Sequence, residues 1–401
     1  MFSRRRFLAL FPAFAASKLA FAAWPIRKKK VVPQPPVHVF FGTDTNKGVS
    51  KGIYRSNFDP VHGQLTPPML IAATARPSYL ALSPPGASRR SLYAVNAIND
   101  PAATVTTFML DPATGNLQKT GQVPSGGAGP AYVSVDSTGH AAFVANYFGA
   151  SIVSYRVQPD GTLSQPVERL DFKDRQKFGA PGSNSTRQDN SHPHCVTISP
   201  DDRFLLVCDL GTDHIAVFYI HPETGLLSDP HLFTNERPAC GPRHVVFHPN
   251  GRWVYCINEI ESSIDRCLWT ATRFSNTPQG LLVNSTFTIK TIAADFPAEK
   301  NTAAELSISP DGSFLYASNR GEDSLVVFSI AKSGDLTLLQ RISCGGKTPR
   351  HFTLDPTAQW LICGNQDSAN ITVFRRDAAT GKLSGPSQTV ALDSPLFTLF
   401  V

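Results

Sequence analysis

One repeat runs along almost the whole chain, and it limits the possible folds more than any other feature. Each copy has an apolar alternating segment, a turn, and a second apolar segment that ends in Asn or Asp. The pattern returns seven times, and a half copy at residues 395–401 ends after one segment. The other first segments begin close to Pro77, Pro130, His194, Gly241, Glu305 and Pro349. Alternation of this kind predicts short β-strands joined by turns.

Glycine-containing tight turns occur with the same count, and each is followed by Leu within two residues. Gly supplies a positive φ and Asp or Pro starts the turn, so each one indicates a β-hairpin. The predicted turns are 59–63, 111–115, 159–161, 221–225, 277–280, 332–334 and 377–381. Two hairpins per copy make four strands, and about 52 residues per copy is close to the length of a propeller blade.

The two ends of the repeat region complete each other. Residues 37–41 open the first copy without a proline-led strand, and residues 395–401 supply one such strand with nothing after it. We therefore predict an all-β fold, a seven-bladed β-propeller over residues 37–401, closed by the C-terminal strand joining the N-terminal blade. The alternative, several separate β domains, would need linkers between the copies. No segment of suitable composition lies between them, although residues 171–193 form a long insertion. The 32 prolines and 17% charged residues also argue against a helical bundle.

The first 36 residues have the pattern of an export signal followed by a linker. Arg4, Arg5 and Arg6 precede Phe-Leu and an apolar stretch that ends at residue 21. This pattern resembles a twin-arginine signal peptide over residues 1–22, with an uncleaved anchor as the alternative. It predicts a periplasmic or secreted protein that uses the Tat export machinery. Residues 23–36 form a basic, proline-rich linker, and no later segment has 18 consecutive apolar residues, so no integral membrane segment is expected after signal removal.

Charge and cysteine content narrow the function classes. The formal net charge is +6, but residues 1–22 hold four basic residues and no acid, which leaves +2 for the remainder. That excess is too small to indicate a nucleic-acid-binding protein. The seven cysteines are an odd number without a CxxC motif, so no disulfide pairing follows from the sequence.

Comparison between copies separates structural residues from candidate functional ones. The Asn or Asp at the end of each second segment recurs, so we interpret it as a turn-stabilising side chain. Two positions at the start of each first segment vary instead, and ionisable groups gather there in consecutive copies. First strands line the channel of a propeller and begin where second strands end, so these groups are expected to converge at one channel mouth. The converging residues are His194, Arg243, Glu259, Glu305, Arg320 and Arg350.

Structural roles and ion binding are the alternatives for this cluster. The charges can pair with one another and fix the packing of the blades. His192 and His194 flank Pro193, but no carboxylate or Cys nearby completes a recognisable ligand spacing, so neither a metal site nor a cofactor is predicted. An ion such as Ca²⁺ in the channel stays open at this point.

Three runs of residues resemble a known family. They are residues 309–321, residues 241–251 with Asn258-Glu259, and Arg187-Gln188 followed by His192-Pro-His194. They resemble the lactonase family of seven-bladed propellers, which includes the bacterial 6-phosphogluconolactonase and is related to the fungal carboxy-muconate lactonising enzyme. The resemblance covers nearly all of residues 37–401. It implies a carboxylic-ester hydrolase, a lactonase, whose site uses a His, a Glu and two Arg.

By motif position, the resemblance places the catalytic residues at His194, Glu259, Arg243 and Arg350. The remaining mouth residues are expected to bind substrate: His244, Glu305, Arg320 and His351. Lactone hydrolysis needs an activated water, a stabilised oxyanion and a protonated leaving group. We expect Glu259 or His194 to be the base, and Arg243 and Arg350 to hold the oxyanion or a substrate carboxylate.

The substrate class follows from the predicted export. Phosphorylated intermediates are scarce outside the cytoplasm, so a small-molecule sugar lactone or another carboxylated lactone is expected alongside a phosphorylated one. A non-catalytic periplasmic propeller that binds a partner is the alternative function, because a fold does not fix an activity. A quinone-cofactor dehydrogenase is disfavoured, since the four tryptophans follow no repeating docking motif. The oligomeric state does not follow from the sequence.

Overall fold

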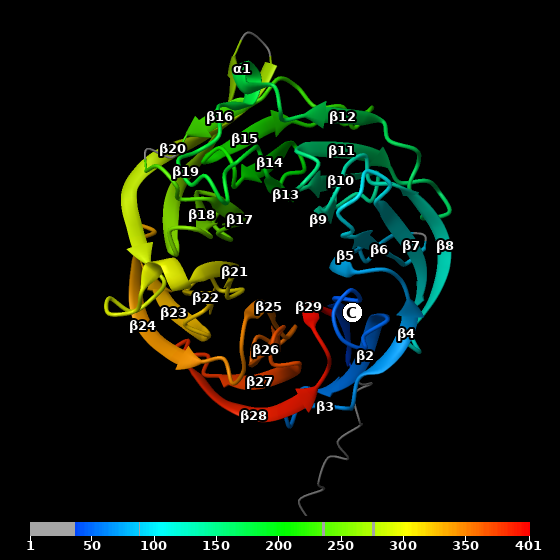
Figure 1. Cartoon of the computed structure of the whole chain (residues 1–401), viewed down its shortest axis with the longest axis vertical. Coiled ribbons are helices and arrows are strands. Elements are labelled where there is room, and N and C mark those ends of the chain that lie inside the picture. The colour runs from blue at the N-terminus through cyan, green and yellow to red at the C-terminus, as the bar shows by residue number, and fades with distance from the viewer. Residues whose placement is uncertain (1–36, 88, 235–236, 275–276) are drawn as a thin grey trace, which may run out of the picture. The chain divides into compact units, whose positions relative to one another are not determined.

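The computed structural model describes residues 37–401 except 88, 235–236 and 275–276. The predicted signal peptide and the linker, residues 1–36, lie outside the described residues. The described chain forms seven antiparallel sheets arranged around a central axis, as Figure 1 shows. The prediction of an all-β, seven-bladed propeller is therefore confirmed.

The sheets follow one another along the chain, and each holds four strands except the first, which holds five. The innermost strands are β5, β9, β13, β17, β21, β25 and β29, and they surround the channel (Figure 1). The strand bounds, blade by blade, are β29 Pro395–Phe400, β1 Val37–Thr43, β2 Gly52–Asp59, β3 Gln64–Leu65 and β4 Met69–Ala73; β5 Pro77–Leu82, β6 Ser91–Asn96, β7 Thr104–Asp111 and β8 Asn116–Pro124; β9 Pro130–Val135, β10 Ala141–Asn146, β11 Ser151–Arg156 and β12 Glu168–Asp171; β13 Pro193–Ile198, β14 Phe204–Asp209, β15 His214–Tyr219 and β16 His231–Thr234; β17 Pro242–Phe247, β18 Trp253–Asn258, β19 Ser263–Phe274 and β20 Thr277–Lys290; β21 Thr302–Ile308, β22 Phe314–Arg320, β23 Ser324–Ile330 and β24 Leu336–Ser343; β25 Pro349–Leu354, β26 Trp360–Asn365, β27 Asn370–Arg376 and β28 Leu383–Ala391.

The C-terminal strand closes the ring as predicted. β29 pairs antiparallel with β1, with Phe40 opposite Leu399 and Val39 opposite Phe400. β1 in turn pairs with β2, so one blade contains both ends of the described chain. Pairing the last strand with the first removes the exposed edge that an open ring would leave on β1.

Apolar side chains fill the spaces between neighbouring blades. The second strands β6, β10, β14 and β26 are buried along their whole length, which explains their continuous apolar runs. Hydrogen bonds near the perimeter add specific links, because Tyr255 donates to the carbonyl of Gly334 (2.6 Å) and Tyr316 to that of Gly381 (2.8 Å). Each of these bonds joins a second strand to the hairpin turn of the next blade.

A β-bulge interrupts the start of every innermost strand. In β5, for example, Pro77 pairs with Asn96 and Tyr79 with Val95, so Ser78 has no partner in the ladder. A bulge lets two consecutive side chains leave the same face, whereas side chains of a regular strand alternate. The residues at the seven bulges are Ser78, Ala131, His194, Arg243, the pair Ala304 and Glu305, Arg350 and Leu396. These are the positions at which the sequence copies differ.

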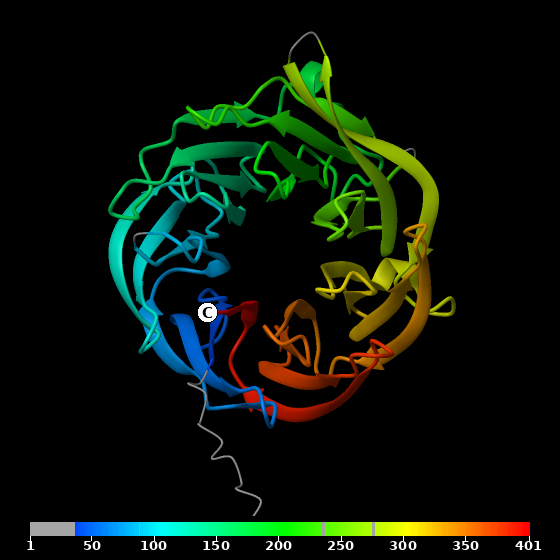
Figure 2. The same cartoon turned by 180° about the vertical axis from the view of Figure 1, so that it is seen from behind.

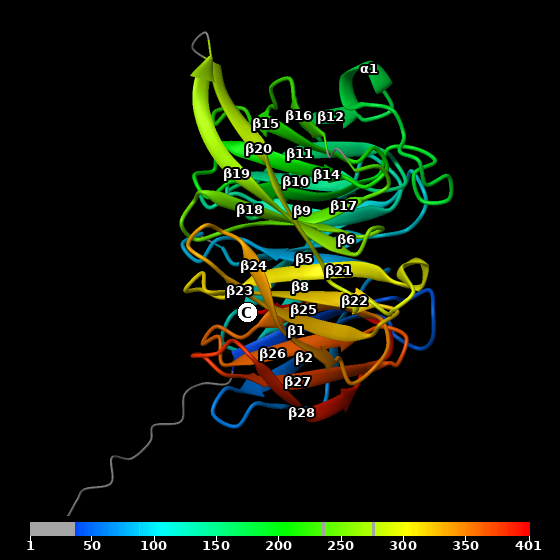
Figure 3. The same ribbon diagram turned by 90° about the vertical axis from the view of Figure 1, so that its left-hand side faces the viewer.

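One predicted hairpin turn is wrong. Residues 277–280 lie inside strand β20, where Gly280 pairs with Ala271 and Pro278 with Arg273. The hairpin of β19 and β20 is longer than its counterparts, 12 and 14 residues, and its tip extends past the rim of the blades in Figures 2 and 3. β20 is an edge strand, which tolerates a proline. The glycines of the other six predicted turns all have positive φ angles.

Two short helical segments interrupt the strands, α1 (Arg175–Phe178) and a 3₁₀ turn (Ala298–Lys300). α1 belongs to the insertion that precedes β13, and Phe178 anchors that insertion in the core between two blades. No helix in the described part of the chain has the length and hydrophobicity that crossing a membrane requires. All seven cysteines are buried and have free thiols, so no disulfide bond is formed among the described residues.

Candidate active site

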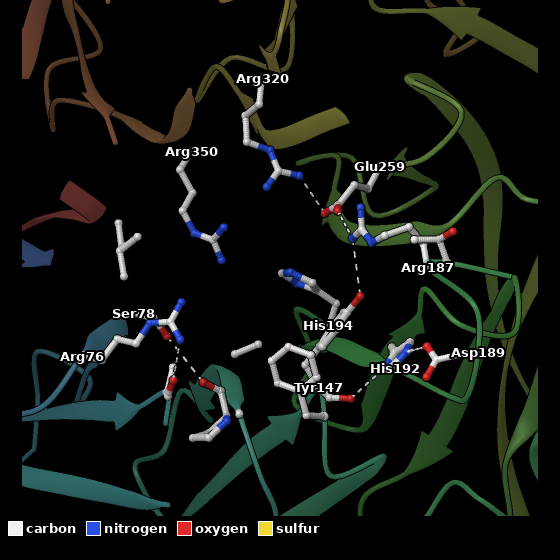
Figure 4. Close-up of a pocket in the computed structure, with 17 residues that line it drawn as sticks. Arg76, Ser78, Tyr147, Arg187, Asp189, His192, His194, Glu259, Arg320 and Arg350 are labelled. Atoms are coloured by element: carbon white, nitrogen blue, oxygen red, sulfur yellow. Dashed lines mark hydrogen bonds and ion pairs between the residues drawn. The ribbon is translucent and has the colours of Figure 1, made fainter. Parts of the chain in front are cut away.

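A cavity of about 460 Å³ opens where the innermost strands begin. Its walls come from several blades and from the insertion before β13, as Figure 4 shows. The polar side chains around it are Arg76, Ser78, Tyr147, Thr186, Arg187, Asp189, His192, His194, Glu259, Arg320 and Arg350. The cavity therefore combines side chains that are far apart in the sequence.

Glu259 is the centre of a buried ion-pair network. It follows directly after β18, and its Oε2 lies 2.8 Å from Nε of Arg243 and 2.8 Å from Nη2 of Arg320. Arg187 donates a hydrogen bond to Oε1 of the same carboxylate (Figure 4). Burial alone would raise the pKa of Glu259, but the three guanidinium groups outweigh it and hold that pKa well below its ordinary value. Glu259 is therefore a permanent anion and a weak proton acceptor.

Backbone contacts hold two of the three arginines, Arg243 and Arg320, in place around this carboxylate. Arg243 donates to the carbonyl of Ala304 at 2.5 Å, and Arg320 to that of Ala303 at 3.1 Å. Arg243 is almost fully buried and does not line the cavity. Arg243 therefore contacts Glu259 from the side away from the cavity and holds its carboxylate in position.

Arg187 reaches the network from the insertion. The next residue, Gln188, anchors that segment by donating to the carbonyl of Leu210 (2.9 Å) and to Oδ1 of Asp213 (2.7 Å). The guanidinium of Arg187 also lies 3.4 Å from the hydroxyl of Tyr147. The insertion thus supplies a charged side chain that the repeats themselves do not provide.

His194 presents a neutral imidazole to the cavity. It occupies the bulge of β13, is buried, and its Nδ1 has no hydrogen-bond partner in the described structure. Burial lowers the pKa of His194 well below its ordinary value, and the nearby Arg243 and His244 lower it further. Nδ1 is itself enclosed by protein, so it is the other, cavity-lining part of the neutral ring that is able to accept a proton from a water or ligand.

Arg350 is the cation of the site without a carboxylate partner. Within the described residues, no acidic side chain lies within ion-pair distance of its guanidinium, which points into the cavity (Figure 4). Burial, together with repulsion from Arg243 and Arg320, lowers the pKa of Arg350 to about 9. An unpaired buried guanidinium favours binding of an anion.

A second layer closes the channel beneath the cavity. Glu305 lies between two imidazoles: its Oε1 is hydrogen-bonded to Nδ1 of His244 (3.3 Å), and its Oε2 lies 3.2 Å from Nε2 of His351. Burial opposes the charge of Glu305, but the two histidines outweigh it and lower the pKa of Glu305 to about 2. The stacked rings of Tyr79 and Tyr132, 3.9 Å apart, fill the rest of the layer.

The structure brings together four of the eight predicted site residues at the cavity: His194, Glu259, Arg320 and Arg350. Arg243 contacts Glu259 from outside the cavity. His244, Glu305 and His351 were expected to bind substrate, but they lie in the closed layer and do not line the cavity. The bulge explains much of this separation, because at five of the seven bulges the first residue of the pair lines the cavity: Ser78, Ala131, His194, Arg350 and Leu396.

Sequence comparison between copies missed Arg76, Tyr147 and Arg187. Arg76 comes just before the proline of β5, two positions ahead of the compared pair Ser78-Tyr79, and its guanidinium lies 3.4 Å from Asp44. Tyr147 follows the recurring Asn146, as Glu259 follows Asn258, so that position carried a usable signal. Arg187 lies in the insertion, which has no equivalent in the other copies with which it could be compared.

Metal binding finds no support at this site. Within the described residues, no group of three or more His, Cys, Asp or Glu side chains is arranged to hold a metal ion. His192 has other contacts: its ring stacks on Tyr147 at 4.4 Å, and its Nε2 lies 2.9 Å from Oδ1 of Asp189.

The fold and the cavity define a seven-bladed propeller with a charged site at its channel mouth. Residues 38–400 match the family model described as lactonase, 7-bladed beta-propeller. The chain therefore belongs to the lactonase family of seven-bladed β-propellers, as the sequence motifs predicted.

Two named relatives and one solved structure are similar to this chain over most of its length and support its membership of the family. The chain is 32% identical over 371 residues to a 6-phosphogluconolactonase of Formosa agariphila, covering 90% of this chain and 99% of that one. It is 28% identical over 365 residues to the 6-phosphogluconolactonase of Bacillus subtilis, covering 90% and 97%. The structure of a periplasmic gluconolactonase from Pseudomonas aeruginosa superposes with a TM-score of 0.79 at 30% identity, covering 91% and 99%. The predicted class, a lactone-hydrolysing carboxylic-ester hydrolase, is confirmed at the level of the family.

Proposed function

We propose that this protein hydrolyses a sugar or carboxylated lactone in the cavity at the channel mouth. The observation that carries the proposal is that one cavity is lined by both the neutral imidazole of His194 and the guanidinium of Arg350, which has no carboxylate partner among the described residues. A base and a cation are the two aids that water attack on an ester carbonyl needs. The names of the relatives, 6-phosphogluconolactonase and gluconolactonase, support the same reaction class.

His194 is the proposed general base. It removes a proton from water as the water oxygen bonds to the lactone carbonyl carbon. Glu259 is unsuited to this task, because three arginines stabilise its ionised form. Glu259 instead keeps Arg187, Arg243 and Arg320 in place, so their charges do not repel one another.

Arg350 stabilises the oxyanion that forms when water adds to the carbonyl. The ring C–O bond then breaks, and the imidazolium of His194 returns its proton to the leaving alkoxide. The product is an open-chain hydroxy acid whose carboxylate carries the negative charge that Arg350 lacks in the free protein. No covalent nucleophile is required, and the residues at the cavity suffice for each proton transfer.

The test is acid release from glucono-δ-lactone and from 6-phosphogluconolactone, followed in a pH-stat against the spontaneous rate. His194→Gln and Arg350→Met are each expected to lower kcat/KM at least 100-fold on either substrate. His62→Ala, which removes an exposed imidazole at a distant turn, is the matched control and is expected to keep full activity. A His194→Gln protein as active as the parent would disprove the assignment of the base.

We also propose that residues 1–22 direct export by the twin-arginine route. The arginines before Phe7 support this proposal, and a structural relative is named as periplasmic. Cell fractionation of the full chain is the test. Replacing Arg4 and Arg5 by Lys is expected to retain the protein in the cytoplasm, and unchanged export would refute the proposal.

A further inference from the structure

The cavity is larger than one sugar lactone requires. Its volume of about 460 Å³ lies within the roughly 300–1,000 Å³ that hold drug-sized ligands, and a hexonolactone is smaller than such ligands. A lactone ring placed between His194 and Arg350 therefore leaves room toward the rim. The side chains around that remaining space show what it accepts.

One wall of this space is aromatic. Phe148 lines the cavity and is 53% exposed, and among the described side chains it is the one Phe, Tyr or Trp ring that is mostly exposed. It lies next to Tyr147, whose ring centre is 5.0 Å away, and Tyr147 in turn contacts His194 edge-on at 5.6 Å. The aromatic wall thus runs from the proposed base to the rim.

The Phe148 ring is held in place before any ligand arrives. It packs directly over Gly129, where even a Cβ atom would come within 2.5 Å of the ring. Gly129 also has a positive φ of 60°, so a side chain at this position is disfavoured on two grounds. A fixed aromatic surface loses little conformational entropy when a ligand covers it.

Polar side chains line the same cavity. Thr186 and Asp189 line it together with Phe148 and are exposed, and Asp189 is oriented by His192, whose Nε2 lies 2.9 Å from Oδ1. A sugar ring presents apolar C–H groups on its face and hydroxyl groups around its edge. An aromatic platform bordered by a carboxylate and a hydroxyl matches both parts, whereas an alkyl chain would leave the polar groups without partners.

We propose that Phe148, Thr186 and Asp189 form a rim subsite for a second sugar ring linked to the lactone ring. The substrate class is then an aldonolactone that carries a glycosyl substituent. This inference rests on the proposed lactonase function, since the lactone ring must occupy the space between His194 and Arg350.

The experiment compares glucono-δ-lactone with cellobiono-δ-lactone, and δ-decalactone reports on an alkyl chain. Wild type is expected to show a higher kcat/KM for the disaccharide lactone than for gluconolactone. Phe148→Ala is expected to lower kcat/KM for the disaccharide lactone about fivefold, mainly through KM, and to leave gluconolactone unchanged. Leu338→Ala, which removes another exposed apolar side chain away from the cavity, is the control and should change neither rate.

Calorimetric binding of cellobionic acid and gluconic acid to the same proteins keeps the inference testable if catalysis fails. The subsite predicts tighter binding of cellobionic acid, reduced in Phe148→Ala. Equal effects of the variant on both sugars, or an effect confined to δ-decalactone, would overturn the subsite and leave the lactonase proposal intact. Absence of any rate above the spontaneous one would overturn the lactonase proposal, and the binding data would then decide on the subsite separately.

Discussion

Arg350 lacks a carboxylate partner, and this leads to a prediction that separates function from stability. We expect Arg350→Met to abolish activity and at the same time to make the protein more stable. Methionine keeps an unbranched, flexible side chain but is shorter and carries no charge. The variant removes a cation that the folded protein holds next to Arg243 and Arg320.

The size of the effect follows from the charge environment. Burial and the two neighbouring arginines lower the pKa of Arg350 from its ordinary, higher value to about 9. A fully buried group would pay roughly 4–5 kcal/mol for such a change. The guanidinium is partly open to the cavity, so solvent screening reduces the expected gain to about 1–2 kcal/mol. The folded-state pKa is the lower one, so the penalty is complete below pH 9 and disappears as the pH rises toward 12.5.

Urea unfolding at pH 7, followed by tryptophan fluorescence, measures this gain. Arg89→Met, which removes an exposed guanidinium far from the cavity, is the control and should change the unfolding free energy by less than about 0.5 kcal/mol. Gluconate should raise the unfolding free energy of wild type but not of Arg350→Met, because a ligand stabilises only the protein that binds it. An Arg350→Met protein less stable than wild type would show that the guanidinium has a structural partner and would refute the reasoning.

Three further predictions concern the ion pairs and the contacts between blades. Glu259→Gln leaves three arginines without their anion and should cost about 3–5 kcal/mol in urea unfolding. The folded-state pKa of Glu305 is lowered to about 2, so its stabilisation is complete above about pH 4.5 and lost as the pH falls toward 2; thermal melts of Glu305→Gln should show a weaker acid dependence than wild type. Tyr316→Phe removes the hydrogen bond to Gly381 and the one that the same hydroxyl accepts from the buried Arg376, and should cost about 2–3 kcal/mol, measured by urea unfolding.

The repeats made the fold predictable because each copy of the sequence pattern predicts the same strands and turns. Alternating apolar residues and glycine turns define four strands per blade, and the half copy at residues 395–401 defines the closure. The turn at residues 277–280 was mispredicted because Pro and Gly also fit an edge strand, and β20 is an edge strand that is longer than its counterparts in the other blades. Local composition identifies a turn residue but does not reveal how far a hairpin extends.

The candidate site was predictable only in outline. Comparison between copies identified where ionisable side chains depart from the repeat, and His194, Glu259, Arg320 and Arg350 do share one cavity. Depth along the channel was not predictable, since a period of two residues cannot indicate a bulge. Arg187 was out of reach for another reason: its position depends on how the insertion folds back over the blades, which involves the contacts of Gln188 with Leu210 and Asp213.

The bulges explain how one scaffold supplies both a reactive surface and a closed floor. In a regular strand His194 and Cys195, or Arg350 and His351, would point to opposite faces, and only one of each pair would reach the channel. At the bulges of β5, β25 and β29 the first side chain reaches the cavity and the second lies in the layer below, whereas at β13 His194 lines the cavity and Cys195 packs between the blades. In the lower layer the buried side chains of Glu305, His244 and His351 lie against one another beneath the cavity. The chemistry of the mouth therefore depends on side chains that the substrate does not touch.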